Sequence, residues 1–344
     1  MRRTPVLAIP RPPEVPRQEG ETVFYLGAPS LSWRWRTTRP LFFSYTSIRR
    51  RFRDPDNGWR LRPRLRLQPA EGNSANDSSG FTKLERDGCW DGLPPEEFAH
   101  DMDLFRREIG RLDFAIPQDW MCEDFMLELT GAKEPGGKWS DRRTAIRTHQ
   151  RRTLESYLLL RDLAPDVPWA IACQGYFEDE YLEHLDDYER AGVDWRAAPR
   201  IAVGSMCKRN ATGPAARIIR RIRRMGGKPH ALGYKREGLR AIFGNVYTSR
   251  NCAYSGDSMA FSHLARKRHY IHPGCQHGKF QYRRRLGRLG YGNCASCLSW
   301  GEWWAADTEL LARGLGHRPR PGIDHAPQRR RVQLEQRTLL AAGS

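Results

Sequence analysis

Eight short apolar segments alternate with amphipathic segments along the chain, and this alternation restricts the fold more than any other feature. The predicted strands are Thr22–Leu26, Leu41–Tyr45, Asn73–Asp77, Leu112–Ile116, Pro168–Cys173, Arg200–Gly204, Pro229–Gly233 and Val246–Tyr254. Apolar residues recur at helical spacing in Glu96–Ile109, Thr144–Leu163, Glu178–Ala191 and Thr212–Met225. Strands that alternate with helices form parallel sheets, so the pattern predicts an α/β fold, a TIM-like (β/α)8 barrel.

A doubly wound sheet is the alternative arrangement of the same elements. No Gly-x-Gly-x-x-Gly motif follows a predicted strand, which argues against its dinucleotide-binding version. We expect a disordered arm over residues 1–20, a barrel over 21–316 and a basic tail over 317–344.

The charge balance points to a polyanionic partner. The 344 residues carry a formal net charge of +18, and nucleic acid is the commonest soluble polyanion. Basic tails can raise the charge without any such partner, so charge alone does not decide whether the protein binds nucleic acid. No apolar run is long enough for a membrane span, and the run at the N-terminus is too short for a signal peptide. We therefore expect a cytoplasmic protein without membrane contact, in the host cytoplasm if it is phage-encoded.

Polar residues follow the predicted strands at the points where the strands end. In a barrel the carboxyl ends of all strands meet on one face, where active sites lie. The residues at these ends are Asp77, Asp119, Gln174, Ser205, Lys235 and Asp257. Each could instead be an ordinary turn former, but six polar residues at the ends of predicted strands favour a pocket.

Three of these residues are carboxylates, which suits chemistry at a glycosidic carbon. One carboxylate can attack the anomeric carbon while another transfers a proton, and a third can accept hydrogen bonds from a base edge. The alternative for each of Asp77, Asp119 and Asp257 is the N-cap of the following helix.

Two further segments have polar groups suited to a purine edge. Gln174 offers both a donor and an acceptor, and Gly175 would let a ligand approach the backbone. Gly204 and Ser205 could present backbone N–H groups in the same way. A strand-end turn explains both segments equally well.

A cysteine and histidine cluster near the C-terminus predicts a metal site. Cys275 and His277 are followed, sixteen residues on, by Cys294 and Cys297, which gives two close pairs of ligands. Mixed thiolate and imidazole ligation favours a structural Zn²⁺ ion within an element spanning residues 269–300. His269 and His272 are alternative ligands, and a redox-active Cys-x-x-Cys is the alternative reading.

The motifs resemble, in their order, those of the tRNA-guanine transglycosylase superfamily, and most closely its DpdA-like branch of deazapurine DNA modification enzymes. The resemblance extends from Phe24 to Trp304. It is carried by Asp77-Ser-Ser-Gly-Phe81, Pro117-Gln-Asp-Trp-Met-Cys122, Gln174-Gly175, Val203-Gly-Ser-Met-Cys-Lys208, Gly256-Asp-Ser-Met-Ala260 and Asn293-Cys-Ala-Ser-Cys-Leu298.

This resemblance implies a pentosyltransferase that exchanges guanine in DNA for a 7-deazaguanine such as preQ0, without strand cleavage. Asp257 matches the nucleophile and Asp77 the proton-transferring carboxylate. Base-recognition positions match Asp119, Gln174 and Gly204, with Gly175 and Ser205 beside them. The implied zinc ligands are Cys275, His277, Cys294 and Cys297, in a C-terminal zinc-binding insertion of the barrel.

Two other functions remain open from the sequence. A tRNA-guanine transglycosylase would use the same chemistry, and a non-catalytic, zinc-stabilised nucleic-acid-binding protein would explain the charge and the cysteines. The sequence departs from the family motif at Ser79, which replaces a glycine and would narrow the space beside the base.

Overall fold

Eight parallel strands form one sheet at the centre of the molecule. The computed structural model describes residues 22–54, 58–63, 68–206, 212–233, 242, 253–268 and 294–312. The strands run in the order β6-β5-β2-β1-β10-β9-β8-β7. Their bounds are β1 (Val23–Gly27), β2 (Leu41–Ser44), β5 (Ser74–Asp77), β6 (Leu112–Ala115), β7 (Ile171–Cys173), β8 (Ile201–Val203), β9 (Pro229–Ala231) and β10 (Ser255–Ser258).

The two outer strands of this sheet come together. Ala115 of β6 forms a parallel bridge with Trp169, two residues before β7. The Ala115 N–H donates to the Pro168 carbonyl at 3.1 Å, and the Ala170 N–H donates to the Ala115 carbonyl at 2.8 Å. The sheet therefore curls until its edges meet, which confirms the prediction of a TIM-like α/β fold over a doubly wound sheet.

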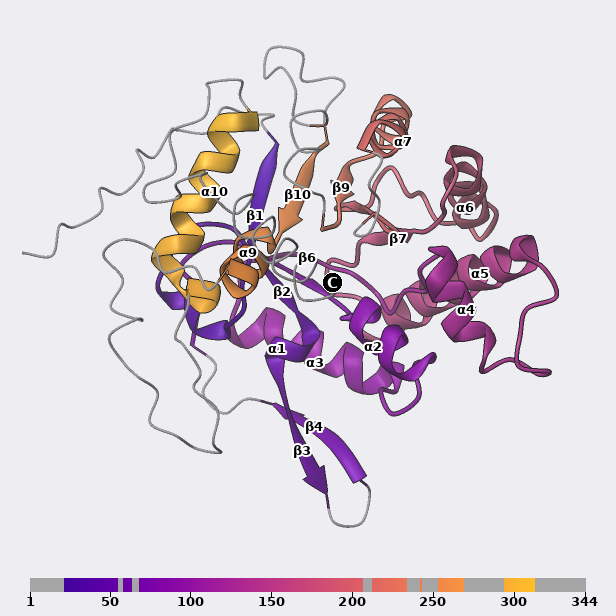
Figure 1. Cartoon of the computed structure of the whole chain (residues 1–344), viewed down its shortest axis with the longest axis horizontal. Helices are drawn as coiled ribbons and strands as arrows, with labels where there is room; N and C mark the ends of the chain where they lie inside the picture. Colours follow the sequence, from indigo (N-terminus) through magenta and orange to yellow (C-terminus); the bar gives the residue numbers. More distant parts are fainter. Residues whose placement is uncertain are drawn as a thin grey trace, which may run out of the picture.

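Helices surround the sheet (Figure 1). The longer ones are α2 (Gly80–Asp87), α3 (Pro95–Glu108), α4 (Asp124–Gly131), α5 (Arg142–Leu163), α6 (Glu178–Arg190), α7 (Thr212–Arg224), α9 (Ala260–Arg268) and α10 (Leu298–Ala312). Shorter ones are η1 (Leu31–Trp35), α1 (Tyr45–Ile48) and η3 (Cys294–Ser296). The four predicted helices correspond to α3, α5, α6 and α7 and agree with them to within two residues at each end.

Alternation along the strands separates an inner and an outer core. The inner cluster lies inside the curled sheet and comprises Tyr25, Phe42, Ala75, Phe114, Ile116, Ala170, Ala172 and Ala202. Neighbouring strand residues, such as Leu26 and Val203, belong instead to the large cluster between the sheet and the helices. Because β7 and β8 contribute only alanine to the inner cluster, the aromatic rings of β1, β2 and β6 fit inside.

The eighth strand lies later in the chain than predicted. We expected it at Val246–Tyr254, but β10 begins at Ser255 and contains Asp257. Ser-Gly-Asp-Ser has little intrinsic preference for a strand. It is extended here because β1 pairs with it on one side and β9 on the other. Pairing within the closed sheet therefore outweighs local propensity.

The sequence pattern also missed an antiparallel hairpin between β2 and β5. Its strands are β3 (Arg49–Asp54) and β4 (Gly58–Pro63), which form a sheet of their own. Figure 1 shows the hairpin projecting from the body of the molecule.

Several predictions fall on other parts of the chain. The arm at 1–20, the tail at 317–344 and residues 269–293 of the predicted zinc element lie outside the described residues. Within the described part, no helix combines the length and the apolar character that crossing a membrane requires.

Candidate active site

The predicted polar residues gather at the carboxyl end of the curled sheet. Asp77 is the last residue of β5, Gln174 follows β7, and Asp257 lies in β10. Asp119 is in the loop after β6, and Ser205 is in the turn after β8. Because these strands are parallel, all five side chains come from the same face. Lys235 lies outside the described residues.

Asp119, Gln174 and Ser205 form a buried hydrogen-bonded chain. The Gln174 amide donates from Nε2 to Asp119 Oδ2 at 2.5 Å, and Ser205 Oγ donates to Gln174 Oε1 at 2.8 Å. Ser205 Oγ in turn accepts from the Cys122 N–H at 2.8 Å. The orientation of the Gln174 amide is therefore fixed, with its NH₂ group toward the carboxylate.

The two glycines of this region serve packing inside the protein. A Cβ atom on Gly204 would lie 2.2 Å from Gln174 Nε2, so only glycine lets the amide lie against the backbone of β8. A Cβ atom on Gly175 would lie 2.9 Å from the Tyr181 backbone nitrogen. We expected a ligand to approach Gly175, but the close neighbour in the structure is helix α6.

Asp119 is almost completely buried, with 4 % of its surface exposed. Ser78 Oγ donates to its Oδ1 at 2.9 Å, so both carboxylate oxygens accept a hydrogen bond from a neutral group. Burial raises the pKa of Asp119 to about 7, with a further contribution from the nearby charge of Asp77. This carboxyl group changes its charge close to neutral pH.

Asp77 ends β5, directly before the sharp turn into α2. Its Oδ1 accepts from the Ser79 N–H at 2.7 Å. Burial raises the pKa of Asp77 to about 6, and repulsion from Asp257 adds to the shift, while hydrogen bonds from Ser79 and Ser44 oppose it. A group with this pKa can both give and take a proton near neutral pH.

Ser79 has a left-handed backbone, with φ at 61°, which explains the glycine of the family motif at this position. Its Oγ lies 2.5 Å from Ser44 Oγ and accepts from the Thr46 N–H at 2.9 Å. These two contacts tie the hydroxyl to the segment after β2. They do not support the expectation that this side chain narrows the space for the base.

Asp257 is also buried, with 5 % of its surface exposed. Its Oδ1 accepts from the Gly233 N–H at 2.8 Å and lies 3.2 Å from His230 Nε2. Within the described part of the chain, no residue donates a hydrogen bond to its Oδ2. Oδ1 is therefore held by described residues, and Oδ2 is the oxygen to which none of them donates.

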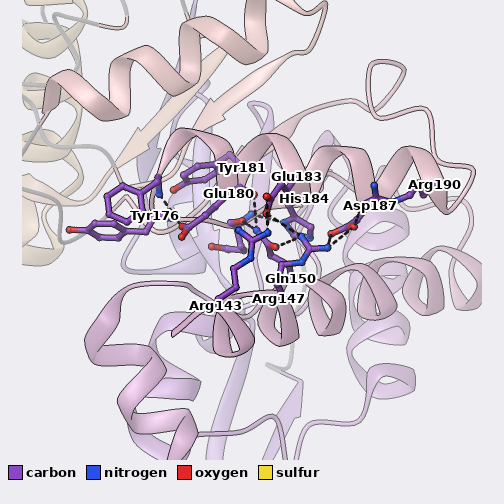
Figure 2. Close-up of polar contacts among 12 residues, drawn as sticks. Arg143, Arg147, Gln150, Tyr176, Glu180, Tyr181, Glu183, His184, Asp187 and Arg190 are labelled. Carbon is purple, nitrogen blue, oxygen red and sulfur yellow. Dashed lines mark hydrogen bonds and ion pairs between the residues drawn. The ribbon is translucent and has the colours of Figure 1, made fainter. Parts of the chain in front are cut away.

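Helices α5 and α6 hold the backbone of Gln174 from outside the sheet. Gln150 Nε2 donates to the Gln174 carbonyl at 2.9 Å, and the Gln174 N–H donates to His184 Nδ1 at 2.9 Å. Burial lowers the pKa of His184 to about 4, which keeps its ring neutral and able to accept. Figure 2 shows these two residues beside the ion pairs that join the helices, including those of Arg143 with Glu183 and Arg147 with Asp187.

Two of the four predicted zinc ligands are described. Cys294 and Cys297 lie on the turn of η3, where the Cys297 N–H donates to the Cys294 carbonyl at 3.2 Å, and both are buried. Two thiols on one buried turn fit half of a tetrahedral site. Cys275 and His277 lie outside the described residues, and the described residues alone bring together no group of three metal-binding side chains.

Sequence reasoning missed three residues that support the site: His230, Ser78 and Gln150. His230 is the second residue of the predicted strand Pro229–Gly233, and a histidine at an inward position of a barrel strand could have signalled it. Ser78 is next to a predicted residue within the same motif. Gln150 lies on a long helix, and nothing in its neighbourhood along the chain marks it out.

Comparison with known proteins agrees with the resemblance of the motifs. No curated protein matches the sequence. The model of one family, DpdA (DeoxyPurine in DNA protein A), matches residues 21–313, which include the whole curled sheet and every residue of the site described above. The chain therefore belongs to the DpdA family.

Proposed function

We propose that the protein exchanges guanine in DNA for a 7-deazaguanine base, preQ0 or a derivative, through a covalent intermediate on Asp257. Membership of the DpdA family implies a transglycosylase-type enzyme with DNA as its substrate. The observation that carries the specific reaction is the set of three carboxylates, Asp77, Asp119 and Asp257, which come together at one end of the sheet in three different hydrogen-bonding environments.

In the first step, Asp257 attacks C1′ of the target nucleotide. A bond forms between the carboxylate oxygen and C1′, and the bond from C1′ to N9 of guanine breaks. Asp77 in its protonated form delivers a proton to the departing purine. The pKa of Asp77, at about 6, makes this form accessible near neutral pH.

In the second step, the 7-deazaguanine takes the place of guanine. Asp77, now ionised, accepts the N9 proton of the incoming base. N9 attacks C1′, the bond between C1′ and Asp257 breaks, and the carboxylate is restored. Each residue ends the cycle in its initial state, so the exchange is reversible in principle.

Asp119 and Gln174 are suited to recognise the base in both steps. An ionised carboxylate accepts hydrogen bonds from the N1–H and the exocyclic amine of guanine, groups that 7-deazaguanines share. The Gln174 amide is already oriented by Ser205. Because the acceptor and donor groups are held before the base arrives, little side-chain entropy is lost on binding.

The nucleotide must leave the base stack to reach these carboxylates, since Asp119 and Asp257 are buried and Asp77 is half-buried. We propose that the β3–β4 hairpin contacts the DNA backbone while the target nucleotide is in the site. Six arginines lie on its two strands, and the hairpin leaves the sheet after β2, whose last residue, Ser44, pairs in register with Asp77. Positive charge at this point attracts phosphates without selecting a sequence.

We also propose that Cys294 and Cys297 hold a structural Zn²⁺ ion with Cys275 and His277. When bound, the ion would tie the segment before α10 to the chain after α9. Metal analysis of the purified protein is expected to give about one zinc per chain. A protein that is folded, active and free of metal would contradict this assignment.

The base exchange is tested by incubating the protein with labelled preQ0 and with duplex DNA, single-stranded DNA or tRNA. We expect label to enter DNA, and nucleoside mass spectrometry to identify the deazaguanine deoxynucleoside. Label in tRNA alone would show that the substrate is wrong. Label in neither, with DNA binding intact, would favour a non-catalytic protein.

A further inference from the structure

We propose that His230 is a positioning residue that holds Oδ1 of Asp257 and thereby leaves Oδ2 as the attacking atom. This inference rests on the proposed function, in which Asp257 attacks C1′. His230 lies on β9 and is completely buried, and its two ring nitrogens face Asp257 and Ser255, so it acts through Asp257.

The argument starts from the two oxygens of Asp257. Oδ1 accepts the Gly233 N–H at 2.8 Å and lies within hydrogen-bonding distance of His230 Nε2, at 3.2 Å. No described residue donates to Oδ2. An oxygen with two donors has its lone pairs engaged, while the other keeps its lone pairs for the reaction.

A chain of hydrogen bonds fixes which ring nitrogen of His230 carries the proton. Arg200 Nε donates to Ser255 Oγ at 3.0 Å, and Ser255 Oγ lies 2.8 Å from His230 Nδ1. The ionised Asp257 carboxylate can only accept, so the ring nitrogen facing it, Nε2, carries the proton, and Nδ1 accepts the hydroxyl proton of Ser255. The ring proton is then on Nε2 and faces Asp257.

The ring stays neutral in this arrangement. Burial lowers the pKa of His230, and the positive charge of Arg200 acts in the same direction, against the opposing effect of Asp257. A neutral donor orients the carboxylate, whereas a full positive charge beside it would stabilise the ion and weaken it as a nucleophile.

Aromatic rings of the inner cluster hold the imidazole in place. Phe42 stacks on it with centroids 5.3 Å apart and planes 12° apart, and Phe114 meets it at 5.0 Å and Tyr25 at 5.9 Å, both edge to face. These contacts resist rotation of the ring. The inner core therefore positions the proposed nucleophile through one side chain.

The proposal is tested with His230→Gln and His230→Leu, compared by kcat and by KM for the free base. The Leu variant lacks any donor, so its kcat is expected to fall about 100-fold, as on removal of one preorganised donor. KM for the base should stay within about twofold, because Asp119 and Gln174 are untouched. The Gln variant can still direct an N–H at Oδ1 and should recover most of the activity.

Two readouts separate positioning from a merely structural effect: the loss in His230→Leu should fall on kcat and not on KM, and the Gln variant should recover it. Ile222→Val, which loosens the outer core without touching the site, should leave both kcat and KM unchanged. Equal losses in the Gln and Leu variants would overturn the proposal. A wild-type protein that exchanges no base would instead refute the proposed function.

Discussion

Asp119 and Asp257 are two equally buried carboxylates at the carboxyl end of the sheet, and they differ in how many of their oxygens accept hydrogen bonds from the described residues. Asp119 accepts a hydrogen bond on each oxygen, from Ser78 and from Gln174. Among the described residues, both donors to Asp257 lie on Oδ1. A carboxylate with both oxygens engaged suits recognition, and one whose second oxygen has no described donor suits attack, so partners rather than residue type separate the two proposed roles.

The largest effect is expected from replacing Asp257, the carboxylate proposed to attack C1′. Asp257→Asn keeps the shape and removes the nucleophilic charge, so base exchange should fall by at least about 10⁴-fold while DNA binding persists. Label transfer into DNA measures this. Asp103→Asn on α3, away from the pocket, is the matched control and should retain activity. Exchange that persists in Asp257→Asn would assign the nucleophile elsewhere.

The second prediction tests the proposed recognition of the base by Asp119 and Gln174. In Gly204→Ala the new methyl group would lie 2.2 Å from Gln174 Nε2 and must displace the amide. KM for the free base should rise by about 100-fold, equivalent to roughly 2.7 kcal/mol. In the control Gly213→Ala nothing lies within 4 Å of the new methyl, and kinetics should not change. Normal KM in Gly204→Ala would remove Gln174 from base recognition.

A third prediction concerns pH and stability. The pKa of Asp119 is raised to about 7 in the folded protein, so folding takes up a proton there between about pH 4 and pH 7. The stability that this proton gives is complete below pH 4 and is lost as pH rises through 7, by at most about 1.4 kcal/mol per pH unit. Asp119→Asn should flatten this part of the pH dependence, as measured by urea unfolding at pH 5 and 8. An unchanged pH dependence of stability in Asp119→Asn would contradict the raised pKa of Asp119.

The smallest effect is expected at Ser79, beside Asp77. Ser79→Gly relieves a left-handed serine, a gain of about 1 kcal/mol, and loses the two contacts of the hydroxyl, a loss of similar size. Thermal unfolding should therefore shift by only a few degrees. Selectivity among deazaguanines should stay the same, since the hydroxyl is directed to Ser44 and Thr46. A changed selectivity would place Ser79 in the base pocket after all.

The sequence was sufficient to predict seven of the eight strands of the sheet and the polar residues at strand ends, because both depend on local order. Asp77 ends one short strand and Gln174 follows another, and parallel strands bring such residues to one face. His230 depends instead on the closed sheet, since its contacts with Phe42, Phe114 and Asp257 join strands far apart in the chain. β10 was misplaced for the same reason, because long-range pairing makes a strand of Ser-Gly-Asp-Ser.

The residues that hold the backbone of Gln174 determine how the site responds to ionic strength. Gln150 and His184, which hold its backbone, are buried and neutral, whereas pairs such as Arg143 with Glu183 are partly exposed. Dissolved salt screens exposed charges and leaves buried neutral hydrogen bonds nearly unaffected. Salt should therefore release a polyanion from this basic chain while the pocket keeps its shape. Affinity for the polymer and affinity for the free base can then be measured separately on one unmodified protein.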